Sequence, residues 1–215
     1  MELTPQSSAA DFLPEQRTLD SLRGAARSCR GCDLYKNATQ TVFGEGPSGA
    51  TVLLVGEQPG DMEDRQGHPF VGPAGRLLDK ALEEARIARD EVYITNAVKH
   101  FRWIRRGKRR LHQKPLVRQV VACKPWLEAE IQSIHPKVIV CLGATAAQSM
   151  LGKTVRIMQE RGKFFDLDSG RTVFITIHPS SIYRLQEKDQ QQREYRRFVD
   201  EMKLVQRRLR RSAAA

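Results

Sequence analysis

Residues 51–60 read TVLLVGEQPG, and the fold of the whole chain can be approached from this stretch. Val52–Val55 is an apolar run, which predicts a β-strand, and Gly56 to Gly60 form the Gly/Pro-rich loop that ends it. The next periodic segment, PAGRLLDKALEEARI (73–87), has helical spacing of its apolar residues, with Pro73 at the first turn. A strand, a loop and a helix therefore follow one another within this part of the chain.

The same alternation continues toward the C-terminus. Further strands are predicted at 91–100, 137–143 and 171–181, and further helices at 18–28, 116–134, 144–151 and 193–211. Pro125 should bend or divide the helix that contains it. This order predicts an α/β fold, in which a mostly parallel sheet carries helices on both faces. We expect one domain over residues 17–211, preceded by a flexible arm at residues 1–16.

Bulk composition points to a polyanionic partner. The formal net charge is +11, and the calculated pI is about 9.9. Such a basic domain most often binds nucleic acid, although a basic surface that is only solvated would have the same net charge. The sequence has no apolar run long enough to span a membrane and no signal-peptide pattern at its start, so a cytoplasmic protein is expected. Two of the four cysteines form CRGC (29–32), a spacing typical of metal or cluster ligands.

Polar side chains follow three of the predicted strands. Glu57 and Gln58 come after the first, Asn96 ends the next, and His178 follows the last. Ligands of open α/β sheets bind outside the carboxyl ends of the strands, so these residues should meet at one edge. A Walker loop is not present, because the position of its first glycine holds Ala147, and a GxGxxG fingerprint is also missing.

Three segments resemble the active-site motifs of the uracil-DNA glycosylase superfamily. They are GEQPGDMEDRQGHPFVGPAG (56–75), NAVKH (96–100) and HPSSIYR (178–184). The N-terminal CxxC resembles the iron–sulfur branch of that superfamily, and KRRLH (108–112) resembles the signature of UdgX, the variant that becomes covalently attached to uracil-containing DNA. The resemblance implies a three-layer α/β/α fold with a four-stranded central sheet. It also implies a partner, uracil-containing DNA, single-stranded or double-stranded, bound by a monomer.

The resemblance assigns roles around a base flipped out of the DNA. Phe70 would stack on uracil, Asn96 would read its N3–H and O4, and His178 would donate to O2. Gly56 and Gln58 complete the expected uracil site. Contacts to DNA are expected from Lys108, Arg109, Arg110, Ser180, Ser181 and Arg184, with Ile182 filling the gap left by the flipped base.

The metal site that the resemblance implies is a [4Fe–4S] cluster. Cys29, Cys32 and Cys123 match the family's ligand positions, while His100 stands where the commoner pattern has a cysteine. Cys141 is the rival fourth ligand, but it lies within the apolar strand KVIVCLG, where a cysteine is most often a small buried apolar residue. A zinc site built from three cysteines and one histidine fits the same donors.

His112 ends the basic run RRGKRRLH (105–112). Nearby lysine and arginine side chains should lower its pKa, and phosphates of bound DNA should raise it. The sequence leaves this balance open, and the predicted mechanism takes the neutral imidazole, which is the nucleophilic form. The predicted activity is excision of uracil followed by attack of His112 on C1′ of the sugar, with Glu57 orienting His112 or stabilising the cation and Gln58 supporting the loop. Two alternatives stay open: a hydrolytic glycosylase with multiple turnovers, and a non-catalytic nucleic-acid binding module with a structural metal.

Overall fold

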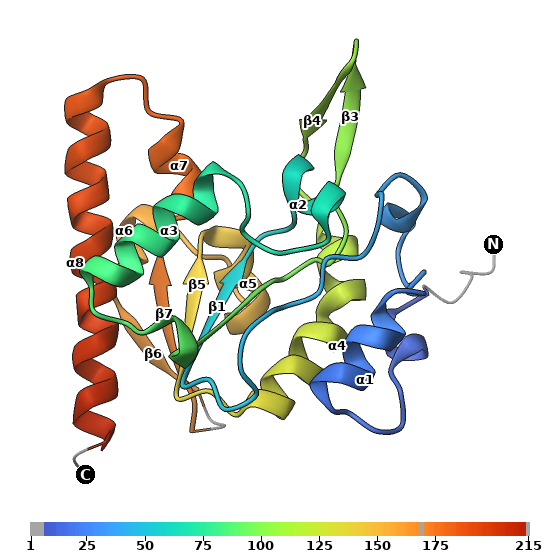
Figure 1. The fold of residues 1–215 in the computed structure, drawn as a ribbon, viewed down its shortest axis with the longest axis horizontal. Coiled ribbons are helices and arrows are strands. Elements are labelled where there is room, and N and C mark those ends of the chain that lie inside the picture. Colours follow the sequence, from blue (N-terminus) through green and yellow to red (C-terminus); the bar gives the residue numbers. More distant parts are fainter. Residues whose placement is uncertain (1–6, 168–169, 214–215) are drawn as a thin grey trace.

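The central sheet has five strands. The structure is a computed structural model that describes residues 7–167 and 170–213 (Figure 1). The strands run in the order β2 (Val92–Asn96), β1 (Val52–Gly56), β5 (Val138–Leu142), β7 (Thr172–Thr176) and β6 (Phe164–Asp166). The first four are parallel, as predicted, and β6 pairs antiparallel with β7 at the edge. The expected number of four strands was therefore one too low, because a strand of three residues leaves little pattern in the sequence.

The register of the parallel strands brings their carboxyl ends level. Gly56 at the end of β1 lies opposite Asn96 at the end of β2, and Leu142 at the end of β5 lies opposite Thr176 at the end of β7. All residues of these four strands are buried, as expected for a parallel sheet covered on both faces. The segments that follow these strand ends therefore begin at one edge of the sheet.

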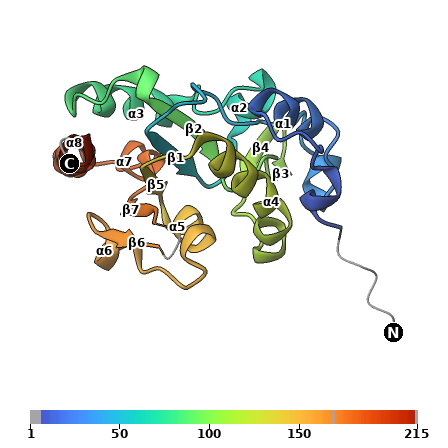
Figure 2. The ribbon, with the colours of Figure 1, turned by 90° about the horizontal axis from the view of Figure 1, so that it is seen from below.

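Helices cover both faces of the sheet (Figure 2). On one face, α3 (Pro73–Glu84) and α8 (Lys188–Ala213) contribute to a core with Leu78, Phe198 and Met202. On the other face, α4 (Val117–Ile134) and α5 (Ala144–Leu151) contribute Leu127 and Ala146. Shorter helices lie between these elements: α1 (Leu19–Ala26), α2 (Asp61–Gln66), α6 (Ile157–Glu160) and α7 (Pro179–Tyr183). The three-layer arrangement is confirmed.

Some boundaries differ from the expected ones. Helix α4 continues through Pro125, next to the fully buried Trp126, so the helix is not divided there; the predicted bend stays a prediction. The basic run is not a loop but a hairpin, made of β3 (Trp103–Arg106) and β4 (Arg109–His112), which stands out from the body of the molecule (Figure 1). Its two-residue turn begins with Gly107 at φ 59°, a conformation that suits glycine.

The N-terminal segment is described from residue 7. Ala9–Phe12 forms a short 3₁₀ helix, and Ala9 is buried in the apolar cluster that also contains Leu22 and Trp126. The first six residues lie outside the described part, so the flexible arm and its boundary at residue 17 stay predictions. In the described residues, the helices are all too short or too polar to span a lipid bilayer.

Candidate active site

A cavity of about 490 Å³ opens at the carboxyl ends of the parallel strands. Glu57 and Gln58 line it from the end of β1, Asn96 from β2, and His178 from the residues after β7. His112 reaches it from the base of the hairpin. The polar residues that the sequence predicted at one edge of the sheet therefore share one cavity with His112.

Asn96 lies at the bottom of this cavity with one unused hydrogen-bond acceptor. The residue is 2% exposed, and its Oδ1 atom is buried with no hydrogen-bond partner among the described residues. Gly56 makes room for it, because a Cβ at that position would lie 2.2 Å from Asn96 Oδ1 and 2.7 Å from Cζ of Phe70. A buried amide oxygen without a donor is costly, so this atom is suited to a ligand that brings an N–H group.

Phe70 forms an aromatic wall of the cavity. Its ring stacks with that of His178 at a centroid distance of 5.8 Å and an interplanar angle of 27°. Its backbone is left-handed, with φ 56°, which is unusual for a phenylalanine and marks a strained position. Gly75 of α3 permits this conformation, since a Cβ there would lie 1.5 Å from the carbonyl oxygen of Phe70.

The tautomer of His178 follows from its neighbours. The backbone N–H of Ser180 donates to Nδ1 at 3.1 Å, and because a backbone N–H can only donate, Nδ1 is an acceptor. Burial, with smaller contributions from Arg184 and His112, lowers the pKa of His178 to about 4. At neutral pH the ring is therefore uncharged and carries its proton on Nε2, which makes it a hydrogen-bond donor.

Glu57 lies between Thr145 and His112. Thr145 Oγ1 donates to Oε2 of Glu57 at 2.5 Å, and Oε1 lies 3.8 Å from Nε2 of His112. Thr145, at the start of α5, belongs to none of the sequence motifs, and only its position in the folded chain identifies it as part of the site. It holds one oxygen of the carboxylate and leaves the other facing the histidine.

His112 is neutral for a different reason from the one that the sequence suggested. Its pKa is lowered mainly by burial, Glu57 acts in the opposite direction, and Arg184 lowers it further. The cations of the hairpin itself are not among the causes, since the strand carries Lys108 and Arg109 away to an exposed tip. The pKa of His112 is therefore lowered, and the largest cause is the partial burial of a side chain that is 44% exposed.

Gln58 fixes which nitrogen of His112 lacks a proton. The backbone N–H of Arg102 donates to Gln58 Oε1 at 3.1 Å, which sets the orientation of the amide. Gln58 Nε2 then lies 2.9 Å from His112 Nε2, 3.0 Å from the carbonyl oxygen of Gln113 and 3.2 Å from that of Arg102. Its two N–H groups have three acceptors, so His112 Nε2 can be released without leaving the buried amide unsatisfied.

Arg110 has partners inside the protein, in place of the DNA phosphates that the sequence suggested. Its guanidinium pairs with Asp64 at 2.6 Å and with Asp61, and it lies over the rings of Phe101 and Trp103. Asp64 is fully buried. These contacts attach strand β4 of the hairpin to α2, so Arg110 is an anchor in this structure. Lys108 and Arg109, the other two predicted DNA contacts of the loop, are exposed.

Helix α7 supplies the remaining predicted contacts. Ser180 and Arg184 line the cavity, and Arg184 Nη2 donates to Ser180 Oγ at 2.7 Å. Ser181 is exposed and donates to the carbonyl oxygen of His178 at 2.7 Å. Ile182, predicted to fill the gap left by a flipped base, is fully buried in the core. The neighbouring Tyr183 is 57% exposed and lines the cavity, so it is better placed for that contact.

Three of the predicted cluster ligands lie together. Cys29, Cys32 and Cys123 belong to one apolar cluster between α1 and α4, into which Trp126 Nε1 donates to Cys29 Sγ at 3.2 Å. Burial raises the pKa of Cys32, and it raises the pKa of Cys123 to about 12. The thiols of Cys32 and Cys123 therefore keep their protons unless a positive centre compensates them.

The two candidates for the fourth ligand, His100 and Cys141, lie in different places. His100 is buried, its Nε2 lies 3.0 Å from Thr41 Oγ1, and its chain neighbour Lys99 donates from the backbone to Cys123 Sγ at 3.3 Å. Cys141 packs in a different apolar cluster, against the sheet and α4 and α5. Across residues 7–167 and 170–213, no three His, Cys, Asp or Glu side chains form a group that could hold a metal ion.

Comparison with known proteins identifies the family. The model of the uracil DNA glycosylase superfamily matches residues 43–203. A type-4 uracil-DNA glycosylase of Thermotoga maritima is 41% identical over 159 residues, which cover 74% of this chain and 79% of the relative. That of Archaeoglobus fulgidus is 35% identical over 189 residues, covering 84% and 92%. That of Saccharolobus solfataricus is 34% identical over 171 residues, covering 76% of each chain. The chain therefore belongs to the uracil-DNA glycosylase superfamily.

Proposed function

We propose that this protein removes uracil from DNA and then remains attached to the sugar through His112, as the resemblance of KRRLH to UdgX implies. The observation that carries the proposal is the neutral His112, whose Nε2 atom accepts a hydrogen bond from Gln58 and lies 3.8 Å from a carboxylate oxygen of Glu57. An unprotonated imidazole nitrogen at a cavity beside a carboxylate is a suitable nucleophile for a cationic sugar.

The remaining residues of the cavity fit uracil. The free Oδ1 of Asn96 would accept the N3–H of uracil, and its amide N–H groups would donate to O4. Phe70 would stack on the ring, and Nε2–H of His178 would donate to O2. Cytosine has no N3–H and carries a donor in place of O4, so it would leave Asn96 Oδ1 without its donor.

The reaction follows from these contacts. The bond between C1′ and N1 of uracil breaks, and the electron pair leaves with the base, where the donor on His178 stabilises the developing charge. The lone pair of His112 Nε2 then forms a bond to the oxocarbenium carbon C1′. The imidazole loses its Nδ1 proton, and the uracil anion gains a proton, so the products are neutral uracil and an alkylated imidazole. Glu57 stabilises the cation during this sequence.

We further propose that Cys29, Cys32 and Cys123, with His100 as the fourth ligand, hold a [4Fe–4S] cluster. The three sulfur atoms lie in one apolar cluster, as suits soft iron–sulfur chemistry. These four residues would hold the cluster, and their soft thiolate donors with one imidazole suit iron–sulfur chemistry. The cluster would be structural, because it would join the CxxC segment to α4 beside the uracil site.

A second candidate is a glycosylase that hydrolyses and turns over, with water in place of His112 at C1′. It is favoured by the identity of the chain to proteins named type-4 uracil-DNA glycosylases. One experiment separates the two. Single-stranded and double-stranded oligonucleotides with one uracil are mixed with the wild-type protein or with His112→Ala, and the products are run on a denaturing gel.

The proposal predicts a heat- and detergent-stable shifted band for the wild type and its loss in His112→Ala. Alkali-labile abasic DNA with many turnovers and no stable band would identify the hydrolytic enzyme. Neither an adduct nor an abasic site, together with equal binding of control DNA, would identify a nucleic-acid binding module.

A further inference from the structure

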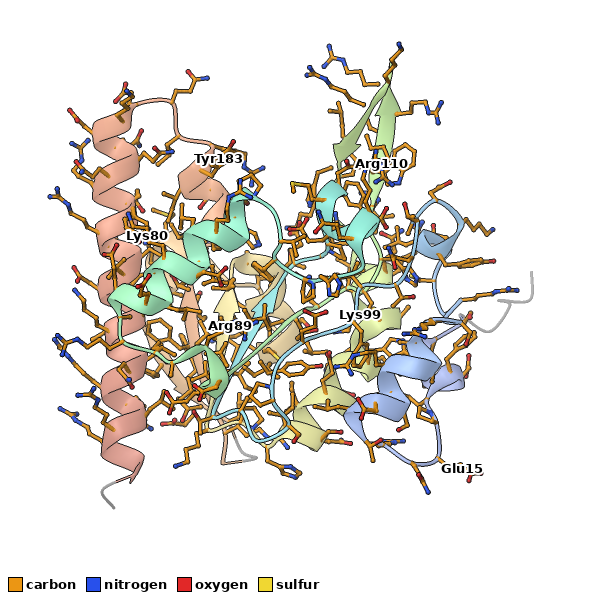
Figure 3. All side chains as sticks on the ribbon, viewed as in Figure 1. Glu15, Lys80, Arg89, Lys99, Arg110 and Tyr183 are labelled. Atoms are coloured by element: carbon orange, nitrogen blue, oxygen red, sulfur yellow. The ribbon has the colours of Figure 1, made fainter. Side chains whose placement is uncertain are left out.

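Lys99 is a buried cation that the sequence motifs do not explain. It is 1% exposed, and it lies in the interior of the molecule (Figure 3). Its ammonium group donates to Glu130 Oε2 at 2.5 Å, to Thr95 Oγ1 at 2.6 Å and to the backbone carbonyl of Asn96 at 2.8 Å. All three N–H groups of the ammonium are therefore used. One of them donates to the backbone carbonyl of Asn96, the residue proposed to read uracil.

Glu130, on α4, is saturated in the same way. It is fully buried, and its Oε1 accepts from the backbone N–H of Gly44 at 3.1 Å, from Tyr93 OH at 3.0 Å and from Thr95 Oγ1 at 3.0 Å. Burial and the adjacent Glu130 raise the pKa of Tyr93, so this phenol keeps its proton and donates. The ion pair thus joins the carboxyl end of β2 to α4 through buried side chains.

The backbone beyond Asn96 is tied to the same helix. The N–H of Lys99 donates to Sγ of Cys123, which is two helical turns before Glu130 on α4. Asn96 is therefore held from its carbonyl by the side chain of Lys99, and the segment that follows is held by the backbone of the same residue. A buried ion pair contributes little net stability, because removing both charges from water offsets much of their attraction. A role in holding the geometry of the site is the remaining explanation for this pair.

We infer that Lys99 is a positioning residue for uracil recognition. It fixes the backbone of Asn96 against α4, so that the Asn96 amide meets the edge of the base at the correct place. The inference rests on the proposed function, since it assigns to Asn96 the reading of uracil. It concerns placement of the amide and requires no direct contact between Lys99 and the substrate.

The test uses Lys99→Met/Glu130→Gln, which removes both charges together because removal of one alone would leave the other buried and unpaired. Uracil release is measured under single-turnover conditions, with free uracil and free cytosine as competing ligands. Since a displacement of about 1 Å can cost about a hundredfold in rate, we expect a loss of that order, together with loss of inhibition by free uracil. Tyr93→Phe is the matched control, because it removes one hydrogen bond to the same carboxylate without changing a contact of Lys99.

Wild-type rates and wild-type inhibition by uracil in the double variant would overturn the inference and reduce Lys99 to a structural cation. Failure of the wild type to release uracil would instead refute the proposed function, and the two failures are distinguished in one assay. If the double variant does not fold, ¹⁵N NMR of the wild type decides. Free uracil should shift the Lys99 ammonium resonance through the Asn96 carbonyl, and an unchanged resonance during saturation would contradict the inference.

Discussion

Gly56 is the residue whose lack of a side chain shapes the uracil site most directly. A Cβ at this position would lie 2.2 Å from Asn96 Oδ1 and 2.7 Å from the Phe70 ring. We therefore expect Gly56→Ala to reduce single-turnover uracil release by about a hundredfold while lowering stability by about 1–3 kcal/mol through overpacking. Gly49→Ala serves as the control, since nothing lies within 4 Å of its added Cβ. Normal activity of Gly56→Ala would show that the amide and the ring are not held as described.

Thr145 acts at the same scale through one hydroxyl. Thr145→Val keeps the shape of the side chain but removes the donor to Glu57 Oε2. A hydrogen bond to a charged group contributes about 1.5–3 kcal/mol, so the rate of adduct formation should fall by at least about tenfold. Thr145→Ser, which keeps the hydroxyl, should restore most of the rate. Equal rates for the two variants would remove Thr145 from the site.

The hairpin is the element on which covalent attachment depends. Arg110 attaches its strand β4 to Asp61 and Asp64 of α2, and Asp64 is fully buried. Arg110→Met leaves that carboxylate without its cation, which should destabilise the protein by about 3–5 kcal/mol, and it should release His112 from its place. We expect the fraction of DNA that becomes covalently attached to fall more than the rate of uracil release does. A proportional loss of both, measured on the same gel, would contradict an anchoring role.

The exposed tip of the hairpin has a separate role. Lys108 and Arg109 are exposed, and no ion pair within the described residues involves them. The double variant Lys108→Ala/Arg109→Ala should keep wild-type stability but bind DNA more weakly. The slope of the logarithm of its binding constant against the logarithm of the salt concentration should become less steep by about 0.7–0.9 for each lost phosphate contact. Fluorescence anisotropy at several salt concentrations measures this slope. An unchanged slope would place the tip away from the DNA backbone.

At the scale of the whole molecule, the neutral His178 makes stability depend on pH. Burial lowers the pKa of His178 to about 4, below its ordinary value of about 6.5. The unfolded chain therefore binds a proton more readily than the folded chain between these values. This contribution to stability is fully present above about pH 6.5 and is lost as the pH falls toward 4. The melting temperature of the wild type should decrease as the pH falls through this window, and that of His178→Asn should decrease less steeply. Parallel curves of melting temperature against pH for the two proteins would contradict a His178 ring that is neutral in the folded state.

The sequence predicted those features that depend on apolar runs and their ends. The parallel strands, the helices on both faces and the common cavity for Glu57, Gln58, Asn96 and His178 follow from four buried strands whose ends lie level. The hairpin was missed because each of its strands contains two consecutive arginines, which interrupt the usual alternation of apolar and polar residues.

Other features could not be read from the sequence at all. Arg109 and Arg110 are adjacent residues of the same type, so the sequence does not distinguish them. Neighbouring residues of a strand point to opposite sides, and therefore Arg109 is exposed while Arg110 is paired with Asp64. The tautomer of His112 depends on Gln58 and on two carbonyl groups that are more than 40 residues away from Gln58 in the chain. Thr145 meets Glu57 only through the packing of α5 beside β1.

The hairpin pairs only with itself among the described strands, and a Cβ at Gly107 would meet nothing within 4 Å. Its tip can therefore carry a dye or a short tag without disturbing the sheet. Lys108 lies in the turn just before β4, four residues from His112, which is roughly 13 Å at the rise of an extended strand. A fluorophore attached at the tip would sit that far from the bond that we propose, and it would mark each captured uracil on a single DNA molecule under a microscope.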